Sequence, residues 1–527
     1  MSYEAEGGYR SPIIGDLTLP PPGASTPDPD ARVAMLVELN VLFPGGLGAV
    51  REAFYATWRE FSDRNGLAPS APAVTEGPTQ PPVPANLELI APKLYQCVLT
   101  RRQLRELVDD DQRLARANER RPPTIFRVWP DYTLEPQIDR SAPTVKADAA
   151  WRSYEARGAG IVWAVIDSGI DGCHPHFAGL ELAREARGDE PPTGLSTGLH
   201  ADFSHLVRPE LPFRDGEYAG PNGPVPPQAL RDRSGHGTHV GGIIAGRLRD
   251  QDPIVAITRE PGDSGFVRRE RVGALSGMAP DCQLVSLKVM RKTDQGTWIT
   301  SSAAVIRALT YLRTEVNVDP AVLRVHGVNM SLGCEWHPEQ YAAGQSPLCQ
   351  ALNQLVMSGV VVVVSAGNFG ARTTSGDSAN TSAVLGSITE PAHAEECVAV
   401  GSTHRDAPHA FGVTWTSGKG PTLDGRMKPD VVAPGEWISS AATGEVRNTA
   451  GLDPQDGKPT YAEQSGTSMA APHVSGVVAA FLSARPEFVG RPRQVKQLLM
   501  NSATDLGRER YAQGAGLVDL MRMLSNV

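Results

Sequence analysis

The chain has 527 residues, more than a single hydrophobic core usually supports, so we expect several domains. Hydrophobic residues make up 40% and charged residues 21% of it, a composition typical of soluble globular proteins. The formal net charge of -9 provides no basic surface for nucleic acid or an anionic membrane, so we expect neither as a main partner.

Residues 1–30 are rich in Pro, Gly and Asp and predict a flexible tail. They show no basic segment followed by an apolar one, so we recognise no secretory signal and expect a cytoplasmic protein. No run of about 18 apolar residues predicts a transmembrane helix. The six cysteines are scattered without a CxxC pair, and we expect free thiols, although the short separation of Cys334 and Cys349 leaves a disulfide between them open.

Residues 31–137 predict a small α+β unit in the order strand, helix, loop, strand, helix, strand. The sequence TRRQ, from Thr100 to Gln103, matches a capping box and marks the start of the second helix. The predicted strands cover 31–40, 93–100 and 125–129, the first helix covers 47–65, and a Pro-rich loop covers 67–87.

From about residue 145 onward, short Val/Ile/Ala runs alternate with helical patterns. Fully apolar strands that alternate with helices predict an α/β fold with a mostly parallel sheet and helices on both faces. Ligands of such folds bind at the carboxyl ends of the strands. Polar signatures stand at these ends: DSGID follows IVWAVI, SLG follows VNM, and AGN follows VVVVVS.

Three polar residues in this part form a candidate catalytic set. Asp167 ends the strand IVWAVID, His236 starts an apolar helix in GHGTHVGG, and Ser468 starts another in GTSMAAPHVSG. A serine hydroxyl needs a general base, histidine is the natural one, and a carboxylate would fix the imidazole tautomer. Taken one at a time, Asp167 could cap a turn, Ser468 could cap its helix, and Asp171 is a rival carboxylate.

The blocks DSGID, GHGTHVGG and GTSMAAPHVSG resemble, in that order, the signature blocks of the subtilisin-like serine proteases. The resemblance extends over roughly residues 140–527 and includes MSLG at 330–333, SAGN at 365–368 and KPDVVAPG at 428–435. The order Asp, His, Ser along the chain is the one known for subtilisin itself, so this order is part of the resemblance.

The resemblance implies a role for each matched residue. Ser468 would attack the scissile carbonyl, His236 would move the proton and Asp167 would orient His236. Asn368 would donate its side-chain amide to the oxyanion, together with the backbone N–H of Ser468. The resemblance gives no catalytic role to His239 or His473, which we interpret as structural. It also implies substrate-binding roles for Ser331, Leu332, Gly333, Ala366 and Gly367.

The same resemblance places the floor of a side-chain pocket near 386–391 (GSITEP). An acidic residue there, Glu390 or Asp377, would favour a basic substrate side chain, but exposed, solvated carboxylates are the favoured interpretation. The natural substrate and its side-chain preference are not determined by the sequence.

Two insertions and one substitution depart from the family pattern. His176 stands where many subtilases have an aspartate for a calcium ion, and 247–271 replaces the loop that would complete that site. No DxDxDG loop offers another site, so we expect no cofactor, with a structural calcium at most. The insertion at 181–230 predicts a solvated surface loop, with a lid or exosite as the alternative.

The resemblance further implies that 31–137 is a prodomain that chaperones folding and inhibits the enzyme at 138–527. VWPDYTLEP at 128–136 resembles a prodomain end and SAPTVKADAAW a mature start, so we hypothesise self-cleavage within 134–142. The predicted function is a serine endopeptidase made as a zymogen, acting on proteins or peptides and released by an activating partner, cleavage or signal. The alternatives are a catalytically silent, peptide-binding regulatory homologue, and an esterase or acyltransferase.

Overall fold

The computed structural model describes residues 12–13, 30, 32–67, 84, 86–91, 93–117, 121–130, 141–180, 182, 194–207, 228–248, 253–259, 266–272, 275–319, 321–334, 342–373, 381–452 and 458–527. The chain divides into two compact units, Met1–Glu135 and Pro136–Val527. The sequence places the domain boundary at 137/138. Most of the predicted tail at 1–30, most of the Pro-rich loop and most of the proposed cleavage region lie outside the described residues. Residues 12–13 correct the expectation of a flexible tail at that point, because Ile13 forms a parallel bridge with Val128 and Val128 N–H donates to the carbonyl of Pro12 at 3.0 Å.

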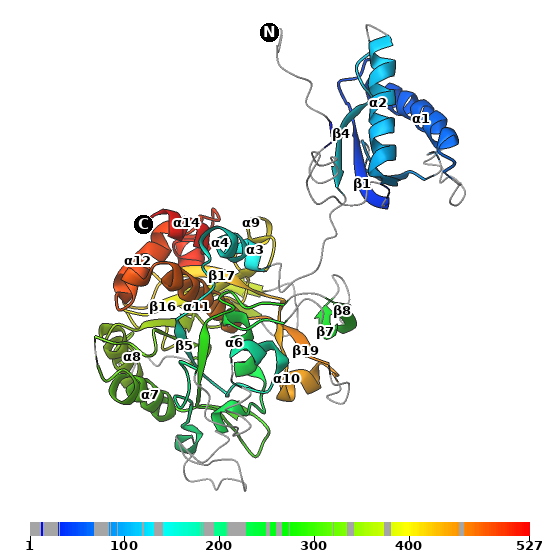
Figure 1. Ribbon diagram of the computed structural model, residues 1–527. Coiled ribbons are helices and arrows are strands. Elements are labelled where there is room, and N and C mark those ends of the chain that lie inside the picture. Colours follow the sequence, from blue (N-terminus) through cyan, green and yellow to red (C-terminus); the bar gives the residue numbers. More distant parts are fainter. Residues whose placement is uncertain are drawn as a thin grey trace. The chain divides into compact units, whose positions relative to one another are not determined.

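The N-terminal unit is a four-stranded antiparallel sheet with two helices, so it contains the three predicted strands, the two predicted helices and one further strand (Figure 1). Alternate residues of β1 and β3 are buried against the aromatic face of α1, which gives the unit a hydrophobic core of its own. The capping box is confirmed: Thr100 N–H donates to Gln103 Oε1 at 3.0 Å and Gln103 N–H to Thr100 Oγ1 at 3.1 Å. The elements are β1 (Arg32–Leu39), α1 (Gly46–Arg64), β2 (Glu88–Ala91), β3 (Leu94–Thr100), α2 (Arg101–Ala117) and β4 (Ile125–Pro130), of which β2 was not predicted.

The large unit is built on a seven-stranded sheet in which every pair of neighbours is parallel, so the predicted α/β class is confirmed. In spatial order the strands are β17 (Val431–Glu436), β16 (Val398–His404), β13 (Val361–Ser365), β12 (Gly327–Met330), β5 (Val162–Asp167), β9 (Gln283–Lys288) and β6 (Ala201–Asp202).

Helices cover both faces of this sheet because its strands are apolar on both sides. In β5, Trp163 and Val165 join one core while Val162, Ala164 and Ile166 join the other. The first core is closed by α4 (Ala147–Tyr154), α6 (His236–Ile244), α11 (Thr467–Ala484), α12 (Pro492–Ser502) and α14 (Leu520–Ser525), and the second by α7 (Ser302–Tyr311) and α8 (Pro347–Met357) (Figure 1).

Shorter elements complete the large unit. They are α3 (Ser141–Thr144), α9 (Pro408–Phe411), α10 (Gly444–Thr449) and α13 (Arg510–Gln513), with the two-stranded pairs β10 (Arg291–Lys292) with β11 (Trp298–Ile299) and β14 (Ala371–Thr373) with β15 (Thr381–Ala383).

The described part of the insertion at 247–271 contains two antiparallel strands, β7 (Pro253–Arg259) and β8 (Phe266–Val272). β7 pairs in parallel with β19 (Thr460–Gln464), which pairs in turn with β18 (Ile438–Ala441). Of the insertion at 181–230, the described part includes β6, and the buried Ala201 and Phe203 belong to the second core. This part is therefore not a solvated loop.

One described helix, α11, is apolar and long enough by composition to cross a membrane, but 83% of it is buried inside the protein. It packs in the first core with strands of the main sheet and with α6. Its hydropathy is therefore that of a central core helix, and it begins at the motif that carries Ser468.

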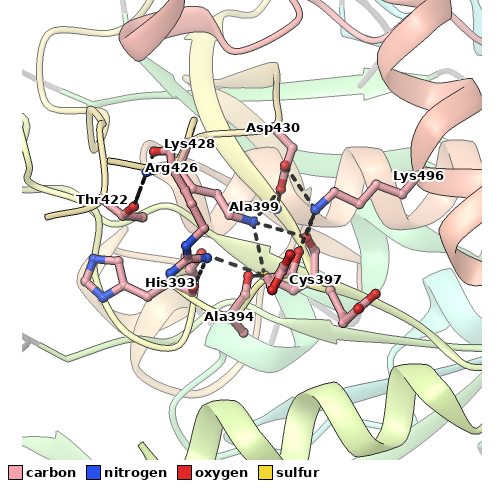
Figure 2. A network of polar contacts seen from close by, with 12 residues as sticks. His393, Ala394, Cys397, Ala399, Thr422, Arg426, Lys428, Asp430 and Lys496 are labelled. Atoms are coloured by element: carbon pink, nitrogen blue, oxygen red, sulfur yellow. Dashed lines mark hydrogen bonds and ion pairs between the residues drawn. The ribbon is translucent and has the colours of Figure 1, made fainter. Parts of the chain in front are cut away.

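A cluster of buried charges joins β16, β17 and α12. Figure 2 shows the Asp430 carboxylate between two ammonium groups: Lys428 Nζ lies 2.7 Å from Oδ2 and Lys496 Nζ 3.1 Å from Oδ1. Both ammonium groups also donate to the carbonyl of Cys397, at 3.2 and 2.7 Å, and Ala399 N–H donates to Asp430 Oδ2 at 2.7 Å. The two lysines and the main-chain N–H hold the pKa of Asp430 below its ordinary value, although burial alone would raise it.

Candidate active site

Asp167 and His236 meet at the carboxyl edge of the main sheet. Asp167 is the last residue of β5 and is fully buried, while His236 is the first residue of α6 and has a quarter of its side chain exposed. The two side chains are joined by a bond of 2.8 Å between His236 Nδ1 and Asp167 Oδ1. Because Nδ1 faces the carboxylate, Nε2 is the ring nitrogen left to exchange a proton with a reacting group.

Asp167 raises the pKa of His236 above its ordinary value. Burial is the largest single effect and opposes the imidazolium, but the charge of Asp167, its hydrogen bond to His236 and the charge of Asp232 together outweigh it. The geometry therefore favours a base that is strengthened by its carboxylate partner.

A second carboxylate, which sequence reasoning missed, holds the segment before His236. Asp232 accepts hydrogen bonds from Gly235 N–H at 2.8 Å, from Thr238 N–H and Oγ1 at 2.9 and 2.7 Å, and from Ser168 Oγ at 3.0 Å. It thereby ties the residue after Asp167 to the first turn of α6. The run DRSGHGT, an acid followed by small residues at a helix start, is the sequence signal for such a turn.

The rival carboxylate Asp171 lies in a different set of contacts. Its Oδ2 accepts from Thr443 Oγ1 at 2.9 Å, and its backbone N–H donates to Thr238 Oγ1 at 2.9 Å. Among the described residues, Asp167 is thus the aspartate that bonds the His236 ring.

Ser468 is the second residue of α11, next to the strand end of β12. Its Oγ donates to the carbonyl of Ser331 at 3.2 Å, and Ser331 Oγ donates to the carbonyl of Ser468 at 2.7 Å. Asn329 Nδ2 supports Ser331 Oγ at 2.9 Å, and Ser475 Oγ supports Asn329 Oδ1 at 2.9 Å. This chain of bonds fixes a hydroxyl at a helix N-terminus, where unpaired N–H groups favour negative charge.

Asn368 stands beside the start of α11, three residues after β13. Its Oδ1 accepts from Thr467 N–H at 2.9 Å and from Thr467 Oγ1 at 3.1 Å. Because the oxygen is occupied, the amide nitrogen Nδ2 is the atom free to serve as a donor. A side chain at Gly466, which has a φ of 150°, would place Cβ 3.3 Å from that nitrogen.

The predicted substrate-binding segments meet around one threonine. A Cβ on Gly333 would lie 2.7 Å from Thr389 Oγ1, and one on Gly367 would lie 2.5 Å from Thr389 Cγ2. Thr389 N–H also donates to the carbonyl of Ala366 at 3.0 Å. The segments 331–333 and 366–367 and the predicted floor at 386–391 are therefore neighbours, as a shared pocket requires, and Leu332 between them is buried.

Glu390 is buried, which corrects the expectation of an exposed carboxylate. Its backbone pairs with Cys334 in both directions, at 2.9 and 3.0 Å, and its Oε1 accepts from the Cys349 thiol at 3.6 Å. This pairing draws the side chain in toward α8. All six cysteines are free, those at 334 and 349 included, and Asp377 lies outside the described residues.

The other candidate histidines are buried structural residues. His239 Nε2 bonds the carbonyl of Ala462 at 2.9 Å, and His473 Nδ1 bonds that of Met469 at 2.8 Å. Burial lowers their pKa values to about 3 and about 4.

His176, which stands where many subtilases have a calcium-binding aspartate, does not fit a calcium ion. Its two ring nitrogens face Tyr461 Oη at 3.2 Å and the Gly242 carbonyl at 3.1 Å, and burial lowers its pKa to about 3. Calcium takes oxygen ligands, and a ring enclosed by protein partners supplies none.

Comparison with known proteins agrees with this geometry. Residues 158–517 match the family model described as the subtilase family. Pyrolysin of Pyrococcus furiosus is 30% identical over 324 residues, which cover 55% of this chain and 21% of that protein. M-protease of Shouchella clausii is 28% identical over 327 residues, 62% of this chain and 61% of that protein. Subtilisin E of Bacillus subtilis is 28% identical over 378 residues, 71% of this chain and 68% of that protein. The matched region thus spans less than two thirds of pyrolysin and of M-protease.

Proposed function

The chain belongs to the subtilase family, and from this premise we propose that it is a serine endopeptidase that hydrolyses peptide bonds in protein or peptide substrates. The observation that carries the proposal is the 2.8 Å bond between Asp167 and His236. Ser468 lies at the start of α11 and Asn368 just after β13, in the same α/β unit. A catalytically silent homologue has no chemical need for all four residues, so this alternative is not favoured.

The chemistry follows from the atoms that these residues present. Ser468 Oγ adds to the carbonyl carbon of the scissile bond while Nε2 of His236 accepts its proton, a step that requires the hydroxyl to leave Ser331. Asn368 Nδ2 and the Ser468 N–H donate to the oxyanion that forms. The C–N bond then breaks, the amine departs with the proton from His236, and water hydrolyses the acyl-enzyme by the same steps.

We further propose that the N-terminal unit is a prodomain that inhibits the enzyme until it is released. Two features support this proposal: the unit has its own hydrophobic core, and it is a compact unit separate from the one that carries the candidate triad. Self-cleavage after residue 134 and before residue 142 would separate the two.

The proposal predicts a self-processing protein that reacts with an active-site probe. Intact mass spectrometry of the full chain, with and without a fluorophosphonate, is expected to show two fragments and one labelled serine. Ser468→Ala is expected to leave one unlabelled chain, whereas the matched control Ser465→Ala, an exposed serine three residues earlier, is expected to behave as wild type. Label on a residue other than Ser468, or label equal in both variants, would contradict the assignment.

A further inference from the structure

The large unit contains a cavity of about 400 Å³, and none of the catalytic roles described above involves its lining residues. Its lining includes Arg233, Lys288, Met290, Arg291, Trp298 and Glu445. These residues come from the segment before α6, the end of β9, the β10–β11 hairpin and α10. A volume of this size is within the range of ligand pockets in proteins.

The backbone connects this cavity directly to the catalytic pair. Lys288 is the register partner of Asp167 in the main sheet, and Val289 N–H donates to the carbonyl of Asp167 at 2.8 Å. Arg233 is three residues before His236, so their Cα atoms are at most about 11 Å apart. Because an extended chain advances about 3.3 Å per residue, we infer that a few substrate residues are enough to reach from the scissile bond to Arg233.

The lining is strongly cationic in a chain whose net charge is -9. Five of its side chains are basic, namely Arg231, Arg233, Lys288, Arg291 and Lys292, against the two acidic side chains of Asp294 and Glu445. Local charge of one sign on the walls of a cavity attracts groups of the opposite sign, even where the whole molecule is acidic.

One of the two acids is already engaged within the wall. Glu445 pairs with Lys292 through Oε1 and accepts from Trp298 Nε1 at 2.8 Å through Oε2. These contacts hold the pKa of Glu445 below its ordinary value. Lys288 is also engaged: its Nζ donates to the carbonyl of Arg231 at 2.9 Å, and its charge acts on the buried Asp202 and Asp232. The lining further carries three arginines, Arg231, Arg233 and Arg291, and one more acid, Asp294. Arg291 Nη1 donates to a neutral acceptor, the carbonyl of Val207, at 3.3 Å.

We propose that this cavity is a substrate subsite that receives the carboxylate of a Glu or Asp side chain close to the scissile bond. Guanidinium groups match a carboxylate in two-point geometry, and Met290 and Trp298 supply walls for the methylene groups of the side chain. The inference rests on the proposed peptidase function and adds to it a substrate class, peptides with an acidic residue near the cleaved bond.

The test uses the full-length chain and pairs of fluorogenic peptides that differ only by Glu or Gln at each of three positions on either side of the cleaved bond. At one position, Glu is expected to raise kcat/KM about tenfold or more over Gln. The preference is expected to fall in 1 M salt, where charges are screened within about 3 Å. Equal values for Glu and Gln at every position would overturn the proposal.

Variants separate the pocket from a general effect of charge. Arg231→Gln and Arg233→Gln are each expected to reduce the ratio of kcat/KM for the Glu peptide to that for the Gln peptide several-fold. Arg233→Glu is expected to make a peptide with Lys at the same position a better substrate than the Glu peptide. Arg152→Gln removes an exposed arginine of α4 outside the pocket lining and is expected to keep the wild-type ratio. A ratio that stays unchanged in the pocket variants would overturn the assignment.

A binding measurement on Ser468→Ala distinguishes failure of this inference from failure of the peptidase proposal. Tighter binding of the Glu peptide than of the Gln peptide, with no hydrolysis by the wild type, would support the subsite and count against the peptidase function. Hydrolysis without a preference for Glu would support the peptidase function and overturn the subsite. Free glutarate that binds as tightly as the Glu peptide would point to a small-anion site and overturn the substrate assignment.

Discussion

At the scale of single residues, the candidate site depends on a buried carboxylate with close hydrogen-bond partners. Asp167 is fully enclosed, yet Oδ1 receives the His236 ring at 2.8 Å and Ser168 N–H at 2.7 Å. Burying a charge is costly unless such partners satisfy it. The bond from His236 to Asp167 sets the tautomer of the ring, and together with the charge of Asp167 it raises the pKa of His236. One contact therefore helps to stabilise the buried carboxylate and also strengthens the base.

The raised pKa of His236 predicts an alkaline-shifted activity profile. The base must be neutral, so kcat/KM is expected to rise with pH through a midpoint above the ordinary histidine value of about 6.5. Asp167→Asn removes the charge that raises the pKa of His236, so the midpoint of its profile should move to lower pH. We also expect kcat to fall on the order of 10,000-fold, the loss known for the same change in a serine protease. The measurement is kcat/KM against pH.

A matched control comes from the neighbouring carboxylate. Asp171→Asn, four residues further along, alters a side chain that bonds Thr443, and it should leave the midpoint close to that of the wild type. A wild-type midpoint at or below 6.5 would contradict the role assigned to Asp167.

At the scale of elements, α6 is a glycine-rich helix whose composition is explained by its neighbours. Glycine weakens a helix by about 1 kcal/mol relative to alanine. A Cβ on Gly237, however, would lie 2.1 Å from the carbonyl of Gly169, in the loop that follows Asp167. The close approach of helix and loop is what allows Gly237 N–H to donate to Ser168 Oγ at 2.9 Å.

Two glycines of α6 therefore predict opposite outcomes for the same substitution. Gly237→Ala should displace the start of α6, lowering unfolding free energy by about 1–3 kcal/mol and kcat/KM by up to about 100-fold, because His236 is one residue away. Gly241→Ala meets its nearest atom at 3.4 Å and should keep activity while gaining up to about 1 kcal/mol. Kinetics, together with denaturant unfolding in the Ser468→Ala background, provide the measurement. Wild-type kinetics for Gly237→Ala would refute the close-approach argument.

At the scale of the whole molecule, buried charges connect segments that are distant in sequence. Asp430 immediately precedes β17, and Lys496 lies on α12 (Figure 2). Asp430 accepts from the N–H of Ala399 on β16, and Lys496 donates to the carbonyl of Cys397, just before β16. Replacing one partner of such a cluster leaves uncompensated buried charge, which costs about 3–5 kcal/mol. The cluster therefore fixes the packing of α12 against the sheet.

Asp430→Asn is expected to destabilise the protein by about that amount at neutral pH, measured by denaturant unfolding in the Ser468→Ala background. The folded-state pKa of Asp430 is lowered, so its contribution is fully present above the unfolded value of about 3.9 and is lost as pH falls through the lower folded value. The difference between the two proteins should therefore shrink below about pH 4. Lys496→Met, which leaves the Lys428–Asp430 pair intact, is expected to cost less. A difference that stays constant down to pH 2 would contradict this account.

The sequence by itself determined the parts of this protein that local pattern controls. Apolar runs such as 161–167 defined the parallel strands, because a strand buried on both faces needs no polar side. TRRQ defined a helix start, because the two hydrogen bonds of the box involve residues only three apart. The motif blocks around Asp167, His236 and Ser468 predicted residues that the structure places at strand ends and helix starts of one sheet edge.

Only the tertiary structure decided what depends on distant partners. Strands β7 and β8 belong to a larger sheet because β7 pairs both with β8 and with β19, about two hundred residues later in the chain. Glu390 is buried because its backbone pairs with Cys334, and Asp232 matters because it joins Ser168 to the first turn of α6. The cationic cavity likewise gathers charges from four separate segments. Periodicity and propensity describe a residue's near neighbours, whereas burial, pairing and local field are set by atoms that only the folded chain brings together.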